Sequence, residues 1–260
     1  MENKIILQTT NLSIGYKTKS ATTILAEKLN LNLHEGKLIA LIGANGIGKS
    51  TLLRTLTGIQ KPLSGKVQLN NKDIHQLEPL ILAQNLSVVL TEKLPPSNLT
   101  VFELVALGRQ PYTNWIGKLT AKDVAKINEA IELTHISHLV EKKHYEISDG
   151  QLQKVLIARA LAQDTPLIIL DEPTTHLDLL HKVSVFKLLK KLTKETQKCI
   201  LFSTHDIDLA IQLSDEMIVI TPKNVVQDEP CNLIKKGTFN TIFKDENIIF
   251  DGEKGRFFFT

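Results

Sequence analysis

The chain has 260 residues, of which 42% are hydrophobic and 23% are charged, and this balance predicts a folded globular protein and excludes a disordered chain. The 31 Lys and Arg residues stand against 28 Asp and Glu, and a net charge of +3 is too small to indicate a surface that coats nucleic acid. Cys199 and Cys231 lack the spacing of a metal site or a disulfide framework, which favours a reducing, cytosolic setting. No stretch approaches the roughly 18 apolar residues of a membrane helix, so we expect another chain to supply any membrane span.

The predicted strands are of two kinds. Residues 4–14 and 29–36 read as short strands, and the alternation of Leu29, Leu31 and Leu33 with polar residues predicts one solvated face. Continuous apolar runs instead predict strands that are buried on both faces of a parallel sheet. There are five such runs, at residues 38–42, 86–90, 167–170, 199–203 and 216–220.

Helical patterns separate these runs, and the alternation of strand with helix predicts an α/β fold. The stretch from about 73 to 163 is mostly helical and is expected to form a lobe inserted into the α/β core. Thr100 can cap a helix that Gly108 would end, and Thr120 with Asp123 makes a second helix start.

The strongest chemical signal is GANGIGKST at residues 43–51, which follows the first apolar run and opens a helical pattern. It matches the G-x-x-x-x-G-K-[ST] pattern of a phosphate-binding loop, whose glycines let backbone amides point at phosphate oxygens. Lys49 is expected to bridge the β- and γ-phosphates of ATP, and Ser50 is expected to ligate Mg²⁺. The residues expected to contact the nucleotide here are Gly43, Asn45, Gly46, Gly48, Lys49, Ser50 and Thr51.

Two further motifs carry polar groups at the ends of predicted elements. LIILDEP at residues 167–173 delivers Asp171 to the end of a strand, where its carboxylate can hold Mg²⁺ through water. Glu172 beside it is placed to polarise the attacking water as a general base. ISDGQ at residues 147–151 precedes a helical segment, so Ser148 and the amide of Gly150 form either an anion-binding corner or a simple helix N-cap.

These three motifs, with THLD at 175–178 and STHD at 203–206, resemble in order and spacing the ATP-binding subunits of ABC transporters. The likeness covers roughly residues 5–220. It implies hydrolysis of ATP with Mg²⁺ as cofactor, on a P-loop NTPase sheet with N-terminal antiparallel strands and an inserted helical subdomain. The implied ATPase domain is residues 1–222, with the subdomain at about 73–163, and residues 223–260 form an extension of short strands and a short helix.

The resemblance also implies roles for single residues. Tyr16 corresponds to the aromatic residue that stacks on adenine, although an ordinary exposed strand tyrosine is the alternative. His205 corresponds to the histidine that contacts the γ-phosphate, and Asp178 to the aspartate that couples two subunits. In this family two chains face each other head to tail, so the ISDGQ corner of one chain, with Ser148, Gly150 and Gln151, completes the ATP site of its partner. A homodimer with two composite sites is therefore expected.

Two positions depart from the family pattern. Asp149 stands where the family's LSGGQ motif has glycine, which we interpret as tuning of the corner. Thr91 and Glu92 follow an apolar run where the family carries a glutamine that touches Mg²⁺ and the attacking water. Thr91 is too short to reach as far, although its hydroxyl can bind through a water. One interpretation is that Glu92 is a solvated loop charge and that water completes the metal shell. The sharper hypothesis is that the substitution weakens the loop's grip on the nucleotide, so that hydrolysis without a permease is low and depends more on transporter-driven closure.

Residues 99–113 are similar to a segment of importers of iron-siderophore complexes, haem and cobalamin. Such importers join two ATPase chains to transmembrane permease subunits and draw on a periplasmic or surface substrate-binding protein. The resemblance implies a peripheral position on the cytoplasmic face of the inner (plasma) membrane. The alternative is a soluble ABC-type ATPase that acts on ribosomes or nucleic acid. Such proteins carry paired cassettes, long coiled coils or zinc modules, none of which this sequence contains, so no nucleic-acid partner is expected.

Overall fold

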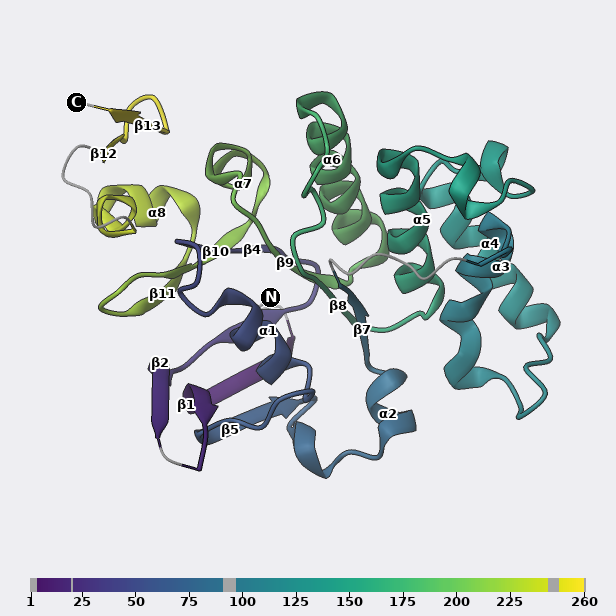
Figure 1. Cartoon of the computed structure of the whole chain (residues 1–260), viewed down its shortest axis with the longest axis horizontal. Helices are drawn as coiled ribbons and strands as arrows, with labels where there is room; N and C mark the ends of the chain where they lie inside the picture. The colour runs from purple at the N-terminus through teal and green to yellow at the C-terminus, as the bar shows by residue number, and fades with distance from the viewer. Residues whose placement is uncertain (1–3, 20, 91–96, 243–247, 260) are drawn as a thin grey trace.

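The computed structural model describes residues 4–19, 21–90, 97–242 and 248–259, and its centre is a six-stranded sheet in the order β11-β10-β4-β9-β8-β7 (Figure 1). All neighbouring pairs are parallel except β10 and β11. The strands are β4 (Leu38–Gly43), β7 (Leu86–Val89), β8 (Leu167–Leu170), β9 (Cys199–Ser203), β10 (Glu216–Ile220) and β11 (Val225–Asp228). The five predicted apolar runs are thus confirmed as parallel strands, within one residue at each end.

The parallel strands contact a different hydrophobic core on each face. In β4, Leu38, Ala40 and Ile42 lie in one core, whereas Ile39 and Leu41 lie in the other. Strands β8, β9 and β10 divide their residues between the same two cores in the same alternating way. Since neither face is solvated, such strands need apolar residues at every position. They therefore appear in the sequence as continuous apolar runs.

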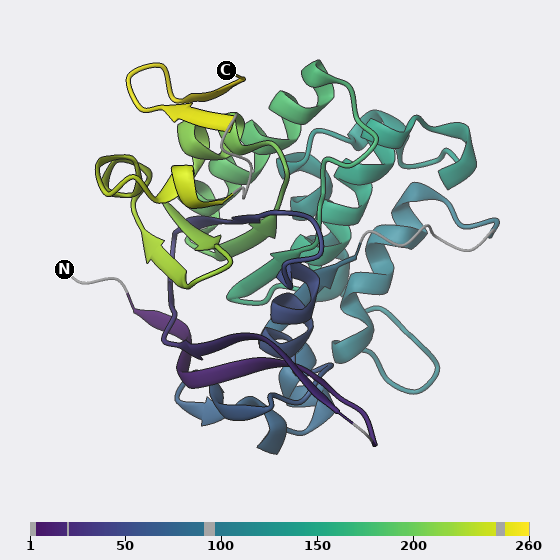
Figure 2. The ribbon, with the colours of Figure 1, turned by 60° about the vertical axis from the view of Figure 1, so that its left-hand side comes forward.

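A smaller antiparallel sheet covers one face of the parallel sheet (Figure 2). Its strands are β1 (Ile5–Lys17), β2 (Thr22–Leu29), β3 (Asn32–His34), β5 (Ser64–Leu69) and β6 (Lys72–Asp73). Helix α1 (Lys49–Leu56) buries Leu52 in the core that also holds Leu7 of β1 and Ile39 of β4.

The strand predicted at residues 29–36 is wrong in one respect, because the structure divides it between β2 and β3. Its leucines are buried and its asparagines are exposed, as expected of one solvated face. Strand β2 itself was missed because it lies at the sheet edge with mostly exposed residues and no apolar alternation.

Helices cover the opposite face of the parallel sheet and extend to one side of it (Figure 1). The long helices there are α5 (Asp149–Ala162), α6 (Leu179–Thr196) and α4 (Ala121–Leu133). The shorter ones are α3 (Val101–Ala106) and α7 (Ile207–Leu213), with 3-10 turns η2 (Leu107–Tyr112), η3 (Ser137–Leu139) and η4 (His144–Glu146). Helix α2 (Pro79–Ala83) and the 3-10 turn η1 (Ile74–Gln76) lie instead on the side of the antiparallel sheet, where Ile74 and Leu82 pack with its core (Figure 1). Strand β7 lies inside the predicted lobe at 73–163, yet it pairs with β8 of the parallel sheet. The first helix of this stretch that packs with the other helices of the lobe, α4 and α5, is α3.

Both predicted helix starts are capping boxes, in which Thr100 pairs with Glu103 and Thr120 pairs with Asp123. The predicted end at Gly108 is wrong, because α3 ends at Ala106 and the chain continues as η2. Gly108 instead allows the backbone of η2 to approach the backbone of α5 closely, since a Cβ there would lie 2.2 Å from the carbonyl oxygen of Arg159.

A buried ion pair ties η2 to α4. Arg109 Nε donates to Asp123 Oδ1 at 2.9 Å, and the two side chains are only 3% and 4% exposed. Arg109 Nη1 also donates to the carbonyl oxygen of Ala162 at 2.8 Å, and the guanidinium lies 3.9 Å from the ring centroid of Tyr112. Asp123 accepts two more hydrogen bonds from Thr120, so both charges are compensated inside the protein.

The C-terminal segment continues from β11 into α8 (Pro230–Lys235), η5 (Thr238–Thr241) and a hairpin of β12 (Ile248–Asp251) and β13 (Arg256–Phe259). The ring of Phe250 stacks on Phe239 at 4.7 Å and meets Phe257 edge-on at 5.0 Å, which joins the hairpin to the main core. Figure 2 shows this hairpin at the end of the molecule away from β1. Within the described part of the chain, no helix is long and apolar enough to cross a bilayer.

Candidate active site

Three of the predicted motifs meet at the carboxyl ends of the parallel strands, because β4, β9 and β8 are neighbours in the sheet. The loop at residues 43–51 leaves the end of β4, Asp171 follows β8, and His205 follows β9 by two residues. The carboxyl ends of parallel strands are where open α/β sheets bind their ligands. The order of the strands therefore brings together residues that lie more than a hundred positions apart in the chain.

Lys49 lies at the first position of α1, and its side chain is buried beneath the loop. Its Nζ donates to the carbonyl oxygens of Gly43 at 3.0 Å and Ala44 at 3.3 Å. Burial lowers the pKa of Lys49, and the negative charges of Glu172 and Asp171 offset part of that lowering. The ammonium thus lies within electrostatic reach of both carboxylates.

A buried serine contacts both residues of the acidic pair. Ser203 Oγ donates to Asp171 Oδ1 at 2.6 Å and accepts the backbone N–H of Glu172 at 2.8 Å. Glu172 has a φ of 48°, a left-handed conformation that side chains other than glycine adopt uncommonly, so this turn depends on partners that hold it. Ser203 was missed as a functional residue, although it begins the STHD motif at the end of β9.

Glu172 and His205 form a direct pair. His205 Nε2 lies 2.5 Å from Glu172 Oε1, and Thr175 Oγ1 donates to the other carboxylate oxygen at 3.1 Å. Both side chains remain open to solvent. A carboxylate held in this way next to an imidazole can accept a proton from a water molecule.

Tyr16, which is half-exposed, approaches the same loop from β1. Its hydroxyl lies 2.6 Å from Thr51 Oγ1 on α1, so the ring stands beside the helix that follows the loop. Asn45, Gly46 and Ser50 are exposed along the loop surface. Thr91, the remaining candidate metal contact, lies outside the described residues, and its role stays a prediction.

The other predicted residues gather at the starts of α5 and α6. Ser148 caps α5 in a capping box with Gln151: Ser148 Oγ accepts the Gln151 N–H at 3.3 Å, and Gln151 Oε1 accepts the Ser148 N–H at 3.0 Å. Asp178 caps α6 through its side chain, whose Oδ1 accepts the N–H of His181. The capping role that the sequence left open for Ser148 is therefore real, and it leaves the amide of Gly150 in the first turn of α5.

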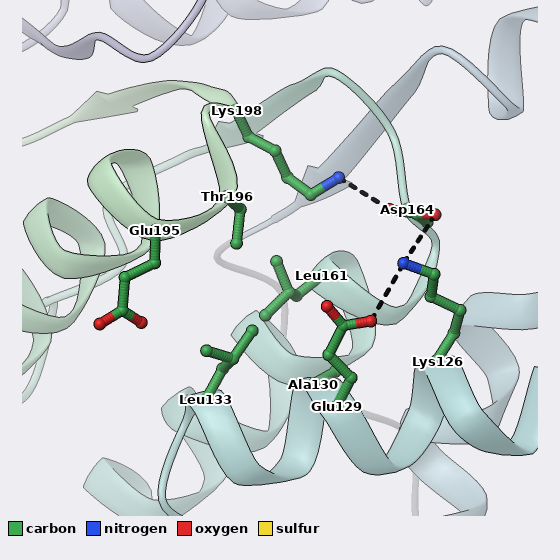
Figure 3. A pocket seen from close by; sticks show the side chains of 9 residues that line it. All are labelled: Lys126, Glu129, Ala130, Leu133, Leu161, Asp164, Glu195, Thr196 and Lys198. Atoms are coloured by element: carbon green, nitrogen blue, oxygen red, sulfur yellow. Dashed lines mark hydrogen bonds and ion pairs between the residues drawn. The ribbon is translucent and has the colours of Figure 1, made fainter.

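A separate pocket of about 320 Å³ lies between α4, the end of α5 and the end of α6 (Figure 3). Lys198 lies 3.0 Å and Lys126 3.3 Å from the carboxylate of Asp164, and Lys126 also pairs with Glu129. Burial raises the pKa of Asp164, but the contacts with Lys198 and Lys126 outweigh it and hold the pKa below its usual value. These charges satisfy one another, and none of the predicted site residues lines the pocket.

Comparison with known proteins identifies the family. Residues 26–175, more than half of the chain, match the family model described as ABC transporter. This chain belongs to the ABC transporter family. It is an ATP-binding cassette that hydrolyses ATP, and the α/β fold agrees with that of other ABC cassettes.

Individual relatives and solved structures are similar to this cassette over most of its length. It is 39% identical to an iron(3+)-hydroxamate import ATP-binding protein of Bacillus subtilis, over 85% of this chain and 81% of that protein. It is 38% identical to an achromobactin transport ATP-binding protein of Dickeya dadantii, over 89% and 85%. A structure of a metal-chelate type ABC transporter in an inward-facing conformation aligns with a TM-score of 0.80 at 28% identity, covering 98% of this chain and 96% of that one. A dimeric cassette in a post-hydrolysis state with ADP and Pi aligns with a TM-score of 0.73 at 28% identity, over 86% and 99%.

Proposed function

We propose that this cassette drives the import of an iron-siderophore, haem or cobalamin type ligand, as a homodimer bound to separate permease subunits on the cytoplasmic face of the membrane. The observation that carries the proposal is the Glu172–His205 pair beside the buried Lys49, on a chain whose relatives are named for iron-chelate transport. A cassette that acts on ribosomes or nucleic acid is not favoured by these relatives. A substrate-binding protein outside the membrane would deliver the ligand to the permease.

In this proposal the residues gathered at the carboxyl ends of the parallel strands act on ATP or on the attacking water. Lys49 exchanges its loop carbonyl contacts for the β- and γ-phosphates, which offer stronger, charge-assisted hydrogen bonds. Glu172 accepts the proton of the water that attacks the γ-phosphate. His205 holds the carboxylate of Glu172 in place and contacts the γ-phosphate. Tyr16 stacks on adenine.

The exposed hydroxyl of Ser50 and the carboxylate of Asp171 would hold Mg²⁺. Both are oxygen donors, and Mg²⁺ binds through few protein ligands together with substrate phosphates, so the donor set fits the ion. When bound, the ion would neutralise charge on the phosphate oxygens. Ser203 fixes the direction of the Asp171 carboxylate for this task.

A second copy of the chain would complete each site. Ser148, Gly150, Gln151 and Asp178 lie at the starts of two helices, where backbone N–H groups favour an anion, and the dimeric relative supports the pairing. We expect Ser148→Arg to lower the fraction of ATP-bound dimer on the order of tenfold or more, because closure would bury an unpaired charge. Size-exclusion chromatography in ATP, with Glu172→Gln present in all samples, measures this fraction. Ser137→Arg, which adds the same charge at an exposed serine of η3, is the control, and an equal dimer fraction in both variants would contradict the proposal.

Exposed apolar side chains would form the surface that contacts the permease. They come from α2 and from the segment around η2, which the hydrogen bond from Gln84 Nε2 to the carbonyl oxygen of Pro111 joins at 3.1 Å. Trp115 is 94% exposed, and large apolar side chains exposed in this way are what an interface with another protein would bury. The exposed residues of this surface are Leu80, Ile81, Leu107, Tyr112, Trp115 and Ile116.

The double variant Trp115→Ser and Ile116→Ser should therefore lose co-purification with the permease and chelate uptake, while the isolated subunit keeps its ATPase activity. Cells that lack the native gene are complemented with each variant, and uptake of labelled ferric hydroxamate, haem and cobalamin is measured. Ile59→Ser, an equally polar change at an exposed residue elsewhere, is the control. Wild-type cells that take up none of the three ligands faster than the deletion strain would overturn the proposed function.

A further inference from the structure

One side chain joins the two helix starts that face the partner. The backbone N–H of His181 donates to Asp178 Oδ1 at 2.9 Å, and its ring Nδ1 lies 2.8 Å from Oδ1 and 2.9 Å from Oδ2 of the same carboxylate. The backbone and ring hydrogen bonds from His181 hold the pKa of Asp178 below its usual value. Both oxygens of Asp178 are thus engaged by one imidazole.

The opposite edge of that imidazole lies against the ISDGQ corner. A Cβ built on Gly150 would lie 2.5 Å from Cδ2 and 3.1 Å from Cγ of His181, closer than packed carbon atoms approach. A side chain at this position would displace the ring, because the ring occupies that space. Since Nδ1 and Cδ2 flank Cγ on opposite sides, the ring touches Asp178 with one edge and the corner with the other.

We infer that His181 is a positioning residue, which holds Asp178 and the start of α5 as one rigid unit for the nucleotide bound by the partner chain. This inference rests on the head-to-tail pairing proposed above. The side chain of Asp178 is 64% exposed, and without the ring it would sample several rotamers and lose entropy at each closure. Fixing the aspartate before the chains meet removes that cost.

The same turn of α6 also reaches the hydrolytic pair of its own chain. Lys182, next to His181, donates from Nζ to Asp206 Oδ1 at 2.9 Å, and Thr174 Oγ1 donates to Oδ2 at 3.2 Å. Asp206 follows His205 directly. Contacts thus run from the ISDGQ corner through His181 and the first turn of α6 to Asp206, the neighbour of His205.

Three substitutions separate the two contacts of the ring. His181→Asn places an amide nitrogen where Nδ1 lies and keeps the hydrogen bond to Asp178, but it leaves the space beside Gly150 empty. His181→Phe keeps a ring against Gly150 and loses the donor. His181→Ala loses both contacts. His75→Ala, at an exposed histidine of η1, is the matched control.

We expect His181→Ala to lower kcat at least about tenfold, and to lower the ATP-dependent dimer fraction in the Glu172→Gln background, without changing the nucleotide affinity of the monomer. The Asn and Phe variants should fall between alanine and wild type, and the Hill coefficient for ATP should fall toward one in all three. Circular dichroism and the melting temperature confirm folding, and a merely structural role would not restore kcat in the Asn variant.

Wild-type kcat and dimer fraction in folded His181→Ala would overturn the inference and leave the proposed function intact. Equally low activity in the Asn, Phe and Ala variants would also overturn it, because neither contact would then position anything separately. If Glu172→Gln with native His181 forms no dimer in ATP, the pairing itself is wrong and both proposals fall together.

Discussion

The Glu172→Gln variant should turn over ATP about 10² to 10⁴ times more slowly than the wild type while it still binds the nucleotide. The amide keeps the shape of the side chain: its oxygen can still accept from His205, and its nitrogen takes the place of the oxygen that Thr175 contacts. It cannot take a proton from water, so the loss is confined to the chemical step. We expect ATP to accumulate in a closed dimer, which steady-state phosphate release together with size-exclusion chromatography will detect.

Lys49→Ala is the variant for comparison. It leaves the general base in place and removes the positive charge that is expected to bind the phosphates. A charge-assisted hydrogen bond contributes about 1.5–3 kcal/mol, so nucleotide affinity should fall on the order of tenfold to a hundredfold. Equilibrium binding of a fluorescent ATP analogue separates the two variants. Wild-type hydrolysis by Glu172→Gln, or weakened binding in that variant to the level of Lys49→Ala, would refute the assignment of Glu172 as the base.

The Asp123→Ala variant should lose about 3–5 kcal/mol of unfolding free energy, the largest stability effect we expect in this chain. Removing the carboxylate leaves the guanidinium of Arg109 buried without its ionic partner, and it also removes the cap of α4. Desolvated charge without compensation is far more costly than a lost surface contact. Urea denaturation followed by circular dichroism gives the difference, provided that the m-value does not change.

Glu103→Ala controls for the capping box alone, because Glu103 occupies the equivalent position in α3 but is exposed. Its loss should be about 1 kcal/mol. The double variant Arg109→Met with Asp123→Ala should recover much of the stability, since no buried charge remains. A loss near 1 kcal/mol in Asp123→Ala, equal to that of Glu103→Ala, would mean that the ion pair contributes nothing beyond the cap.

How far the fold could be predicted depended on the burial of each element. Strands such as β4 and β8 contact a core on both faces, so an unbroken apolar run marks them without ambiguity. Strand β2 gains its place by pairing with β1 at an edge, and its residues Thr22 and Glu27 resemble those of a loop. Gly108 was interpreted as a helix end. The backbone of α5, which leaves no room for a side chain at this position, lies some fifty positions away in the sequence.

Residue type and spacing were enough to single out Lys49, Asp171 and Glu172, which the structure brings near one another, while their roles stay predictions. Ser203 and His181 were not found, because each acts through a partner that only the fold brings near. His181 lies three positions after Asp178, a spacing typical of any capped helix, and nothing in the nearby sequence indicates its contact with Gly150. The plain capping geometry of Ser148 likewise could not be told from an anion-binding corner.

The pairing of β8 with β9 limits how this protein can change during evolution. Leu170 pairs with Phe202, which places Asp171 directly beside Ser203, the residue that orients it. Deleting or inserting one residue in β8 would exchange its two core-facing sets and carry a different side chain to that hydroxyl. We therefore expect the segment 167–170 to accept substitution of one aliphatic residue by another but not a change in its length. Length variation among homologues should therefore fall in loops that end on no catalytic group.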